Sequence, residues 1–499
     1  MPYRNPVIPG FHPDPTVCRV GDHYYAAVSS FVYFPGVPIF RSHNLVDWTH
    51  LGNALDRRSQ LDLSRTTSRA YLGVFAPTLR HHDETFWLIT TVFSADGPQS
   101  FFVTATDPAG PWSDPVPVDL PGIDPDLAWA EGDCWVHASD GERILRTRLD
   151  TETGLLLDPI EPTWSGTGLQ FPEAPHLFRR GVHWYLVIAE GGTERGHAVS
   201  VARGPSPTGP WESCPANPIL SHRSTNEPIQ NTGHADLVEA PDGSWWVMLL
   251  GTRPRGISPG FHVLGRETFL APVTWVAGWP TIDPIQLHNP VSPPGQPAPV
   301  DQAHHDGFDS DDLDPRWVAV RRPPDEFASS TDRPGWLSLT GHADGLDSAY
   351  PAMIARRQQH ERTATSVRVD PGSAREAGVT LYMDDHHHYD IVLIGDEIEV
   401  RCRVGPASST VATAPAPAAP VELFITTVAD REAPDRVVLG HADGSGRRHR
   451  LASLDGRYLS TEVAGGMTGR MIAVFAVDGT AHFCEFDYSP ISTPEEHNP

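Results

Sequence analysis

Hydrophobic residues along this chain occur in short runs of β-branched and aromatic residues, and polar turn residues separate these runs. This alternation is typical of strands rather than of amphipathic helices. Five segments repeat one order of features: a short lead that usually carries proline, an apolar pair, a polar turn and two bulky residues. They read DPTVCRVGDHYY, APTLRHHDETFW, DPDLAWAEGDCW, APHLFRRGVHWY and ADLVEAPDGSWW. The pattern predicts an all-β chain.

The spacing of the five segments is regular. In each segment, the ninth residue after the proline, or after Asp236 in the fifth, opens a strand. These opening residues are Tyr24, Phe86, Cys134, Trp184 and Trp245. Successive ones lie 62, 48, 50 and 61 residues apart, which suits four strands plus loops. Each segment is therefore predicted to be one hairpin of a blade in a five-bladed β-propeller.

Three carboxylates, an aromatic residue and a histidine stand one or two positions ahead of the proline, or of Asp236, at equivalent places in the repeats. They are Asp14, Phe75, Asp124, Glu173 and His234. The innermost strands of a propeller converge on its axis, so we expect these side chains to share one funnel. Burying an unpaired charge costs several kcal/mol, which favours a functional site here over ordinary packing.

Asp14 stands between Pro13 and Pro15. Proline fixes its own φ and restricts the residue before it, so we predict an extended conformation for Asp14. A functional role for a carboxylate held in this way is one interpretation, and the alternative is that the stretch is only a proline-rich lead-in to the first strand.

The same residues lie in segments that resemble a known family. The segments are NPVIPGFHPDPTVCRVGDHYY, GVFAPTLRHHDETFWLITT, GIDPDLAW, FPEAPHLFRR, NTGHADLV and LGRETFL. Their order and spacing resemble glycoside hydrolase family 43, specifically its two-domain β-xylosidases. The resemblance covers nearly all of residues 1–290, which are expected to form the propeller and catalytic domain.

The resemblance implies an inverting hydrolase with Asp14 as general base, Glu173 as general acid, and Asp124 as orienter and pKa modulator. The chemistry agrees with this assignment. Inverting glycosidases hold two carboxyl groups about 6.5–9.5 Å apart, one protonated and one ionised. Asp124 beside Glu173 would raise the pKa of the acid by like-charge repulsion.

Further pocket residues also follow from the resemblance. Arg266 corresponds to an arginine that binds sugar hydroxyls, with a surface salt bridge as the alternative. Phe31, Phe75 and Thr193 fall where relatives line the pocket for the terminal sugar, although blade packing is an alternative for the aromatic residues. His234 is expected to lie near the axis, as a substrate contact and a ligand of a structural calcium ion, or as a hydrogen-bonded core histidine. No cofactor is required for the chemistry.

Beyond the propeller, residues 291–305 are rich in proline and polar residues and are predicted to form a linker. Residues 306–499 show short alternating strands, which predict a β-sandwich. This part resembles the C-terminal concanavalin- or jelly-roll-like domain of the same β-xylosidases. That resemblance implies a sandwich loop near the active site, where Met467 stands in place of an expected phenylalanine.

Two segments of the predicted sandwich invite other interpretations. The run MDDHHHYD contains His386, His387 and His388. Consecutive residues of a strand point to opposite faces, so we predict a hairpin turn rather than a metal site. The segment 409–420, STVATAPAPAAP, is predicted to be a mobile loop.

Charge narrows the class of partner. The chain has 37 Lys and Arg against 63 Asp and Glu, a net charge of −26, which disfavours nucleic acid and anionic membranes. A neutral substrate fits better, because sugars and other neutral ring compounds stack on aromatic surfaces, and the chain has 14 Trp, 11 Tyr and 19 Phe. Most of these rings are expected in the buried core, and a small oligosaccharide is the expected substrate. The five scattered cysteines predict no disulfide framework. Because no signal core or membrane span is recognised, we expect a cytoplasmic protein, with a homo-oligomer left open.

The resemblance to family 43 thus implies an exo-acting, inverting β-xylosidase that releases xylose from the non-reducing end of β-1,4-xylo-oligosaccharides. An α-L-arabinofuranosidase, or a bifunctional enzyme, is the alternative within the same chemistry. A non-catalytic carbohydrate-binding propeller is the alternative from another class, but it would not need both Asp14 and Glu173.

Overall fold

The computed structural model describes residues 2–66, 71–300 and 302–491. They form two compact units, each built almost wholly of strands. The first unit comprises residues 2–66, 72–253 and 266–300, and the second comprises residues 71, 254–265 and 302–491. The predicted all-β architecture, a five-bladed propeller followed by a β-sandwich, is confirmed.

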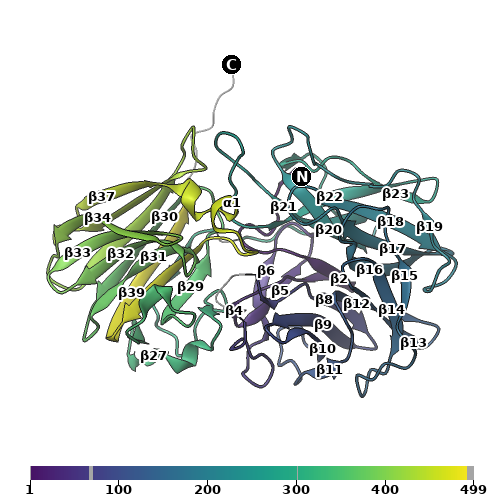
Figure 1. The fold of residues 1–499 in the computed structure, drawn as a ribbon, viewed down its shortest axis with the longest axis horizontal. Coiled ribbons are helices and arrows are strands. Elements are labelled where there is room, and N and C mark those ends of the chain that lie inside the picture. The colour runs from purple at the N-terminus through teal and green to yellow at the C-terminus, as the bar shows by residue number, and fades with distance from the viewer. Residues whose placement is uncertain (1, 67–70, 301, 492–499) are drawn as a thin grey trace. The chain divides into compact units, whose positions relative to one another are not determined.

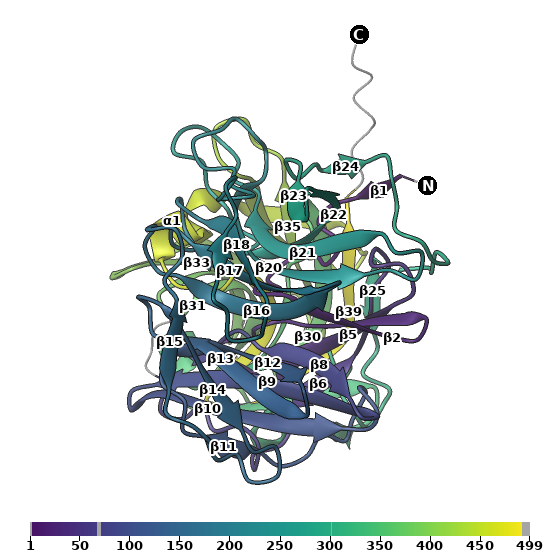
Figure 2. The same cartoon turned by 90° about the vertical axis from the view of Figure 1, so that its right-hand side faces the viewer.

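Five antiparallel sheets form the blades of the first unit (Figure 2). Blade 1 contains β2 (Thr16–Val20), β3 (His23–Ala27), β5 (Gly36–Ser42) and β6 (Thr49–Leu55). Blade 2 contains β7 (Gly73–Val74), β8 (Thr78–His82), β9 (Thr85–Ser94), β10 (Gly97–Ala105) and β11 (Val116–Val118). Blade 3 contains β12 (Ile123–Ala130), β13 (Asp133–Ser139), β14 (Ile144–Leu149) and β15 (Glu161–Trp164).

Blade 4 contains β16 (Glu173–Arg180), β17 (His183–Glu190), β18 (Ala198–Gly204) and β19 (Glu212–Ser213). Blade 5 contains β20 (Gln230–Glu239), β21 (Trp245–Thr252), β22 (Glu267–Val276) and β23 (Trp279–Ile282). The short strands β1 (Tyr3–Arg4), β4 (Tyr33–Phe34) and β24 (His288–Asn289) lie outside the blades, and β1 pairs with β24.

The innermost strands form a closed ring. β2 contacts β8, β8 contacts β12, β12 contacts β16, β16 contacts β20, and β20 contacts β2. Each repeated sequence segment forms the first hairpin of its blade, with turns short enough to fix the register. The turn residues Asp83 and Glu84, like Glu131 and Gly132, all have positive φ, as a two-residue type I′ turn requires.

Residues 3–12, which we call the N-terminal strap, run along β22 of blade 5. The backbone N–H of Val7 donates to Thr268 O at 2.9 Å, and the N–H of His12 donates to Arg266 O at 3.1 Å. The Thr268 hydroxyl donates in turn to His12 O at 2.7 Å. The strap thus joins the segment that carries Asp14 to the last blade.

Two stacked sheets form the second unit (Figure 1). One contains β27 (Ala328–Arg333), β28 (Trp336–Gly341), β39 (Gly479–Pro490), β30 (Thr363–Asp370), β35 (Val421–Val428), β36 (Arg436–Ala442) and β37 (Arg448–Asp455), with β25 (His304–Asp306) paired to β39. The other contains β29 (Met353–Arg357), β38 (Met471–Val477), β31 (Glu376–Asp384), β32 (His387–Ile394), β33 (Glu397–Val404) and β34 (Ala407–Pro415). The remaining elements are β26 (Ala319–Val320), η1 (Pro324–Glu326), η2 (Gly345–Asp347), η3 (Gly456–Leu459) and α1 (Thr461–Ala464).

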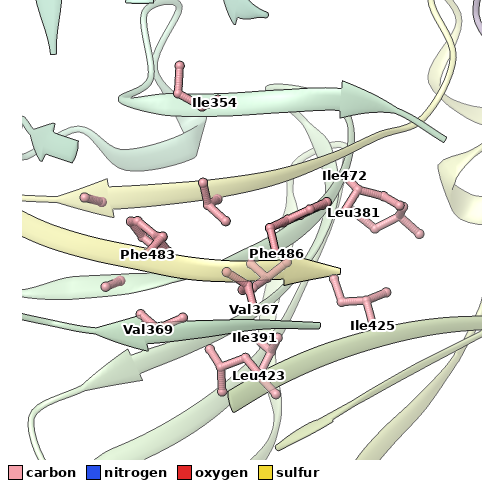
Figure 3. Close-up of a cluster of buried hydrophobic side chains, with 14 of the residues drawn as sticks. Ile354, Val367, Val369, Leu381, Ile391, Leu423, Ile425, Ile472, Phe483 and Phe486 are labelled. Atoms are coloured by element: carbon pink, nitrogen blue, oxygen red, sulfur yellow. The ribbon is translucent and has the colours of Figure 1, made fainter. Parts of the chain in front are cut away.

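Apolar side chains from both sheets meet in the core of the sandwich (Figure 3). Ile391 and Ile472 come from one sheet, and Leu423, Phe483 and Phe486 come from the other. All five side chains are buried, as expected for the facing sides of two packed sheets.

Two smaller predictions for this unit have different outcomes. Residues 385 and 386 form the turn between β31 and β32, so the predicted hairpin is confirmed. His388 Nδ1 forms a hydrogen bond with Asp390 Oδ2 at 2.8 Å. The predicted mobile loop at 409–420 is wrong for residues 409–415, which belong to strand β34. β34 is the edge strand of its sheet, where a proline at the strand end removes no ladder hydrogen bond.

The five cysteines are free thiols. In the described part of the chain, no helix has the length and apolar character that crossing a membrane requires.

Candidate active site

The inner strands carry an unusual backbone conformation where the candidate residues lie. Asp14, Asp124 and His234 have φ values of 56°, 55° and 50°, and Ala174, which follows Glu173, has 53°. Strand pairing also shifts register at the start of β12, β16 and β20, as at a β-bulge. Left-handed bulges change the direction in which a side chain points and are concentrated next to active sites. Four blades therefore carry a residue with left-handed backbone at or near the start of the innermost strand.

The predicted extended conformation of Asp14 is wrong, because its φ is +56°. Aspartate tolerates the left-handed region better than most residues. Two bonds to the carboxylate hold this conformation: the Ser29 hydroxyl donates to Oδ2 at 2.5 Å, and Arg266 Nη1 donates to Oδ1 at 2.8 Å. Proline neighbours restrict a backbone locally, but here these distant partners decide which allowed region Asp14 occupies.

Asp14 is a buried, ionised carboxylate. Its side chain is 5% exposed, and His234 Nδ1 lies 3.5 Å from Oδ1. Burial alone would raise the pKa of Asp14, but Arg266, His234 and the Ser29 hydrogen bond together hold that pKa below its ordinary value. Burial lowers the pKa of His234 to about 3, so its imidazole is neutral. Asp14 is therefore available as a proton acceptor at neutral pH.

Arg266 links three of the predicted pocket residues. Besides Asp14, its Nη1 donates to the Thr193 hydroxyl at 3.1 Å, and its Cζ lies 5.4 Å from the Phe31 ring centroid. Its Nε and Nη2 are buried and have no hydrogen-bond partner among the described residues. A buried N–H without a partner is costly, so these two groups are suited to hydroxyl oxygens of a ligand.

Aromatic rings line the same side of the site. The Phe31 and Phe75 centroids lie 5.2 Å apart, and Phe75 stacks on Phe93 at 5.5 Å. Phe31 has a φ of 49°, and its carbonyl packs so tightly on Gly73 that a Cβ there would lie 2.1 Å from the Phe31 oxygen. Gly73 therefore permits the close approach that positions Phe31.

Glu173 and Asp124 form an electrostatically coupled pair. The Glu173 side chain is 19% exposed. Burial, and then the negative charge of Asp14, raises the pKa of Glu173 to about 7. Burial, Glu173 and Asp14 also raise the pKa of Asp124 well above its ordinary value, so the two carboxyl groups share one proton. The backbone N–H of Ala174 donates to Asp124 Oδ2 at 3.2 Å, a bond that favours the ionised form of Asp124.

A buried, neutral histidine lies next to Glu173. His197 Nδ1 lies 3.0 Å from Asn231 O, which can only accept, so this nitrogen carries the hydrogen. Nε2 therefore carries no hydrogen, and it lies 3.8 Å from Glu173 Oε1, which is beyond hydrogen-bond distance. Burial lowers the pKa of His197 to about 4, so the ring is neutral. Gly233 leaves room for this ring, since a Cβ there would lie 2.3 Å from it.

The guanidinium of Arg80, in blade 2, contacts a residue of each of the other four blades. Arg80 of blade 2 donates to Asp236 of blade 5 at 2.8 Å and to Asp126 of blade 3 at 2.7 Å. It also lies 3.0 Å from His176 Nδ1 of blade 4 and donates to the Thr16 hydroxyl of blade 1 at 3.2 Å. We call these five residues the axial cluster. Because Thr16, Asp126 and Asp236 each lie two residues beyond Asp14, Asp124 or His234, the axial cluster fixes the strands that carry the site.

The axis does not fit a calcium ion held by several protein ligands. Calcium takes six to eight oxygen ligands, mostly carboxylates and carbonyls. Arg80 already binds the carboxylates of Asp126 and Asp236, and residues 2–66, 71–300 and 302–491 include no group of three His, Cys, Asp or Glu arranged for a metal. His234 supplies one imidazole, so its calcium role stays a prediction.

The structure brings the sequence-derived candidates together. Direct contacts connect Asp14 to Arg266 and His234, Arg266 to Thr193 and Phe31, and Phe31 to Phe75. Asp124 and Glu173 interact through their charges, since Glu173 raises the pKa of Asp124. Sequence reasoning missed Ser29, His197 and Arg80. Only Arg80 carried a signal, because it lies within the second repeated segment and would be a buried charge there.

Comparison with known protein families covers both units. A model of glycosyl hydrolases family 43 matches residues 3–280, and a model of the beta-xylosidase C-terminal concanavalin A-like domain matches residues 305–490. The non-reducing end alpha-L-arabinofuranosidase BoGH43B of Bacteroides ovatus is 36% identical over 95% of this chain and 91% of its own length. A xylosidase/arabinosidase of Butyrivibrio fibrisolvens is 34% identical over 97% of this chain and 98% of its own length.

Solved structures show the same fold. The xyloglucan-locus GH43B structure from Bacteroides ovatus has a TM-score of 0.91 at 36% identity and covers 98% of this chain and 100% of its own. The GH43 protein BlXynB from Bacillus licheniformis has a TM-score of 0.91 at 30% identity, with the same coverage of both chains.

Proposed function

Because the chain belongs to glycosyl hydrolases family 43, and is therefore a glycoside hydrolase, we propose that it is an exo-acting, inverting β-xylosidase. It would release xylose from the non-reducing end of short β-1,4-xylo-oligosaccharides. The observation that carries the proposal is that the pKa values of two carboxyl groups in one site are shifted in opposite directions. The pKa of Asp14 is lowered and that of Glu173 is raised to about 7, as a base and an acid of one reaction require.

In the proposed mechanism, Asp14 takes a proton from the water that attacks the anomeric carbon. Glu173 gives its proton to the glycosidic oxygen, so the leaving sugar departs as a neutral alcohol. Arg266 keeps Asp14 ionised and offers its two remaining N–H groups to hydroxyls of the terminal sugar. Asp124 and Glu173 share one proton, and while Glu173 carries it, the negative charge of Asp124 favours that protonated form.

Stereochemistry tests the role of Asp14. A base that acts through water displaces the leaving group once and inverts the anomeric centre, whereas a nucleophile displaces twice and restores it. Proton NMR of the hydrolysis of a β-xyloside, read before mutarotation, is expected to show α-xylose first. Early β-xylose would instead assign Asp14 as a nucleophile and overturn the proposal.

An α-L-arabinofuranosidase, or an enzyme with both activities, is the second candidate. The relatives named arabinofuranosidase and xylosidase/arabinosidase, which match nearly the whole chain, favour it. Comparison of kcat/KM on the 4-nitrophenyl glycosides of xylopyranose and arabinofuranose distinguishes the two.

The pH profile tests the role of Asp124. Activity is expected to fall as pH rises through the pKa of Glu173, about 7, because the acid loses its proton there. Asp124→Asn removes a neighbouring negative charge, lowers that pKa, and should move the alkaline limb of kcat/KM to lower pH by about one unit or more. Asp119→Asn changes an exposed aspartate five residues earlier and should leave the limb in place. An unmoved limb in Asp124→Asn would show that Asp124 does not tune the acid.

A further inference from the structure

Phe171 is an exposed aromatic residue in a strained backbone conformation. The residue is 52% exposed and has a φ of 53°. A single exposed apolar side chain is ordinary, but a bulky residue with positive φ is uncommon and costs free energy. Such conformations persist where the surrounding structure imposes them, often beside functional sites.

The backbone on both sides of Phe171 is fixed. The N–H of Gly191 donates to Gln170 O at 2.7 Å, and the Gln170 side-chain amide donates back to Gly191 O at 3.2 Å. On the other side, the Ser139 hydroxyl donates to Pro172 O at 2.5 Å. The exposed ring is therefore held by an anchored segment, residues 170–172, and stacking on it would cost little ordering entropy.

The ring lies beside the acid and beside the loop that contacts Arg266. Glu173 follows two residues after Phe171. A Cβ on Gly192 would lie 3.6 Å from Phe171 Cδ2, so ring and loop are neighbours. The next residue of the loop, Thr193, accepts the hydrogen bond from Arg266. Phe171 thus occupies the solvent-exposed edge of the site on its Glu173 side.

The chemistry of the acid indicates what lies on that side. Glu173 protonates the oxygen that joins the terminal sugar to the rest of the substrate, so the departing sugar lies next to the acid. The C–H face of a pyranose ring packs on an aromatic ring in the same way as other flat apolar surfaces. We propose that Phe171 is the stacking platform for the first pyranose of the leaving group, an inference that rests on the proposed β-xylosidase function.

Two substrates separate this role from the rest of the site. Xylobiose has a pyranose leaving group, whereas β-xylosyl fluoride presents the same terminal sugar with a leaving atom too small to stack. Phe171→Ala should lower kcat/KM on xylobiose by about tenfold. The same variant should keep kcat/KM on β-xylosyl fluoride within about twofold of the wild type, since its terminal-sugar contacts are intact.

Conservative and control variants complete the experiment. Phe171→Tyr should keep wild-type kcat/KM on xylobiose, and Phe171→Leu should lose nearly as much as alanine, because leucine has no flat face. Val182→Ala removes an exposed apolar side chain at the opposite end of β16 and should change neither substrate. Equal rates of wild type and Phe171→Ala on xylobiose, or equal losses on both substrates, would overturn the proposal. Failure of the wild type to cleave xylobiose would instead reject the proposed function.

Discussion

Alanine in place of Glu173 is expected to lower kcat on xylobiose by about 10²- to 10⁴-fold, the usual contribution of general acid catalysis. Xylose is a poor leaving group and needs the proton that Glu173 supplies. An aryl xyloside with a strongly acidic phenol departs without protonation, so its kcat should remain close to that of the wild type. On xylobiose, the residual activity of the variant should lack the alkaline limb near pH 7, since the group that titrates there is gone.

Steady-state kinetics of both substrates, from the same preparations, measures this difference. Glu194→Ala is the matched control, because it removes an exposed glutamate from the loop that carries Thr193. Equal losses on xylobiose and on the aryl xyloside would show that Glu173 is not the acid.

Arg80→Met is expected to lower the free energy of unfolding by about 3–5 kcal/mol, the typical loss when one partner of a buried ion pair is removed. Methionine fills much of the space but leaves Asp126 and Asp236 as uncompensated buried carboxylates. These are 0% and 3% exposed in their side chains. Since Arg80 contacts all four other blades, the substitution should destabilise the whole propeller.

Chemical denaturation of the full chain measures this effect. Arg179→Met serves as a control, because Arg179 is exposed on the outer part of β16. Adding Asp126→Asn and Asp236→Asn to Arg80→Met should recover part of the lost stability, since the orphaned charges are then removed. A stable single variant, or no recovery in the triple variant, would show that Arg80 does not hold the blades through its ion pairs.

The sequence predicted the fold well because each blade repeats the same spacing of turn and strand residues. The constant nine-residue offset to Tyr24, Phe86, Cys134, Trp184 and Trp245 located five hairpins, and closure of the ring then placed equivalent positions together. Convergence of Asp14, Asp124 and Glu173 followed from that symmetry. The cytoplasmic location and the place of Met467 in the pocket wall stay predictions.

Other features depend on contacts that no local pattern encodes. The left-handed φ of Asp14 is stabilised by Ser29 and Arg266, which are 15 and 252 residues away in sequence. The orientation of His197 depends on the carbonyl of Asn231, and the space for its ring depends on Gly233. The loop predicted at 409–420 is wrong over 409–415, because edge strands accept a composition that central strands do not.

The N-terminal strap has a consequence for biosynthesis. Asp14 is translated 252 residues before Arg266, an interval of roughly 13 to 50 s at about 5–20 residues per second. During that interval, strap and carboxylate have no β22 on which to dock. Blades 1 to 4 can form hairpins on the nascent chain, but the ring closes only when blade 5 emerges from the ribosome. A chain released before that point carries both Asp14 and Glu173 and still lacks a working site.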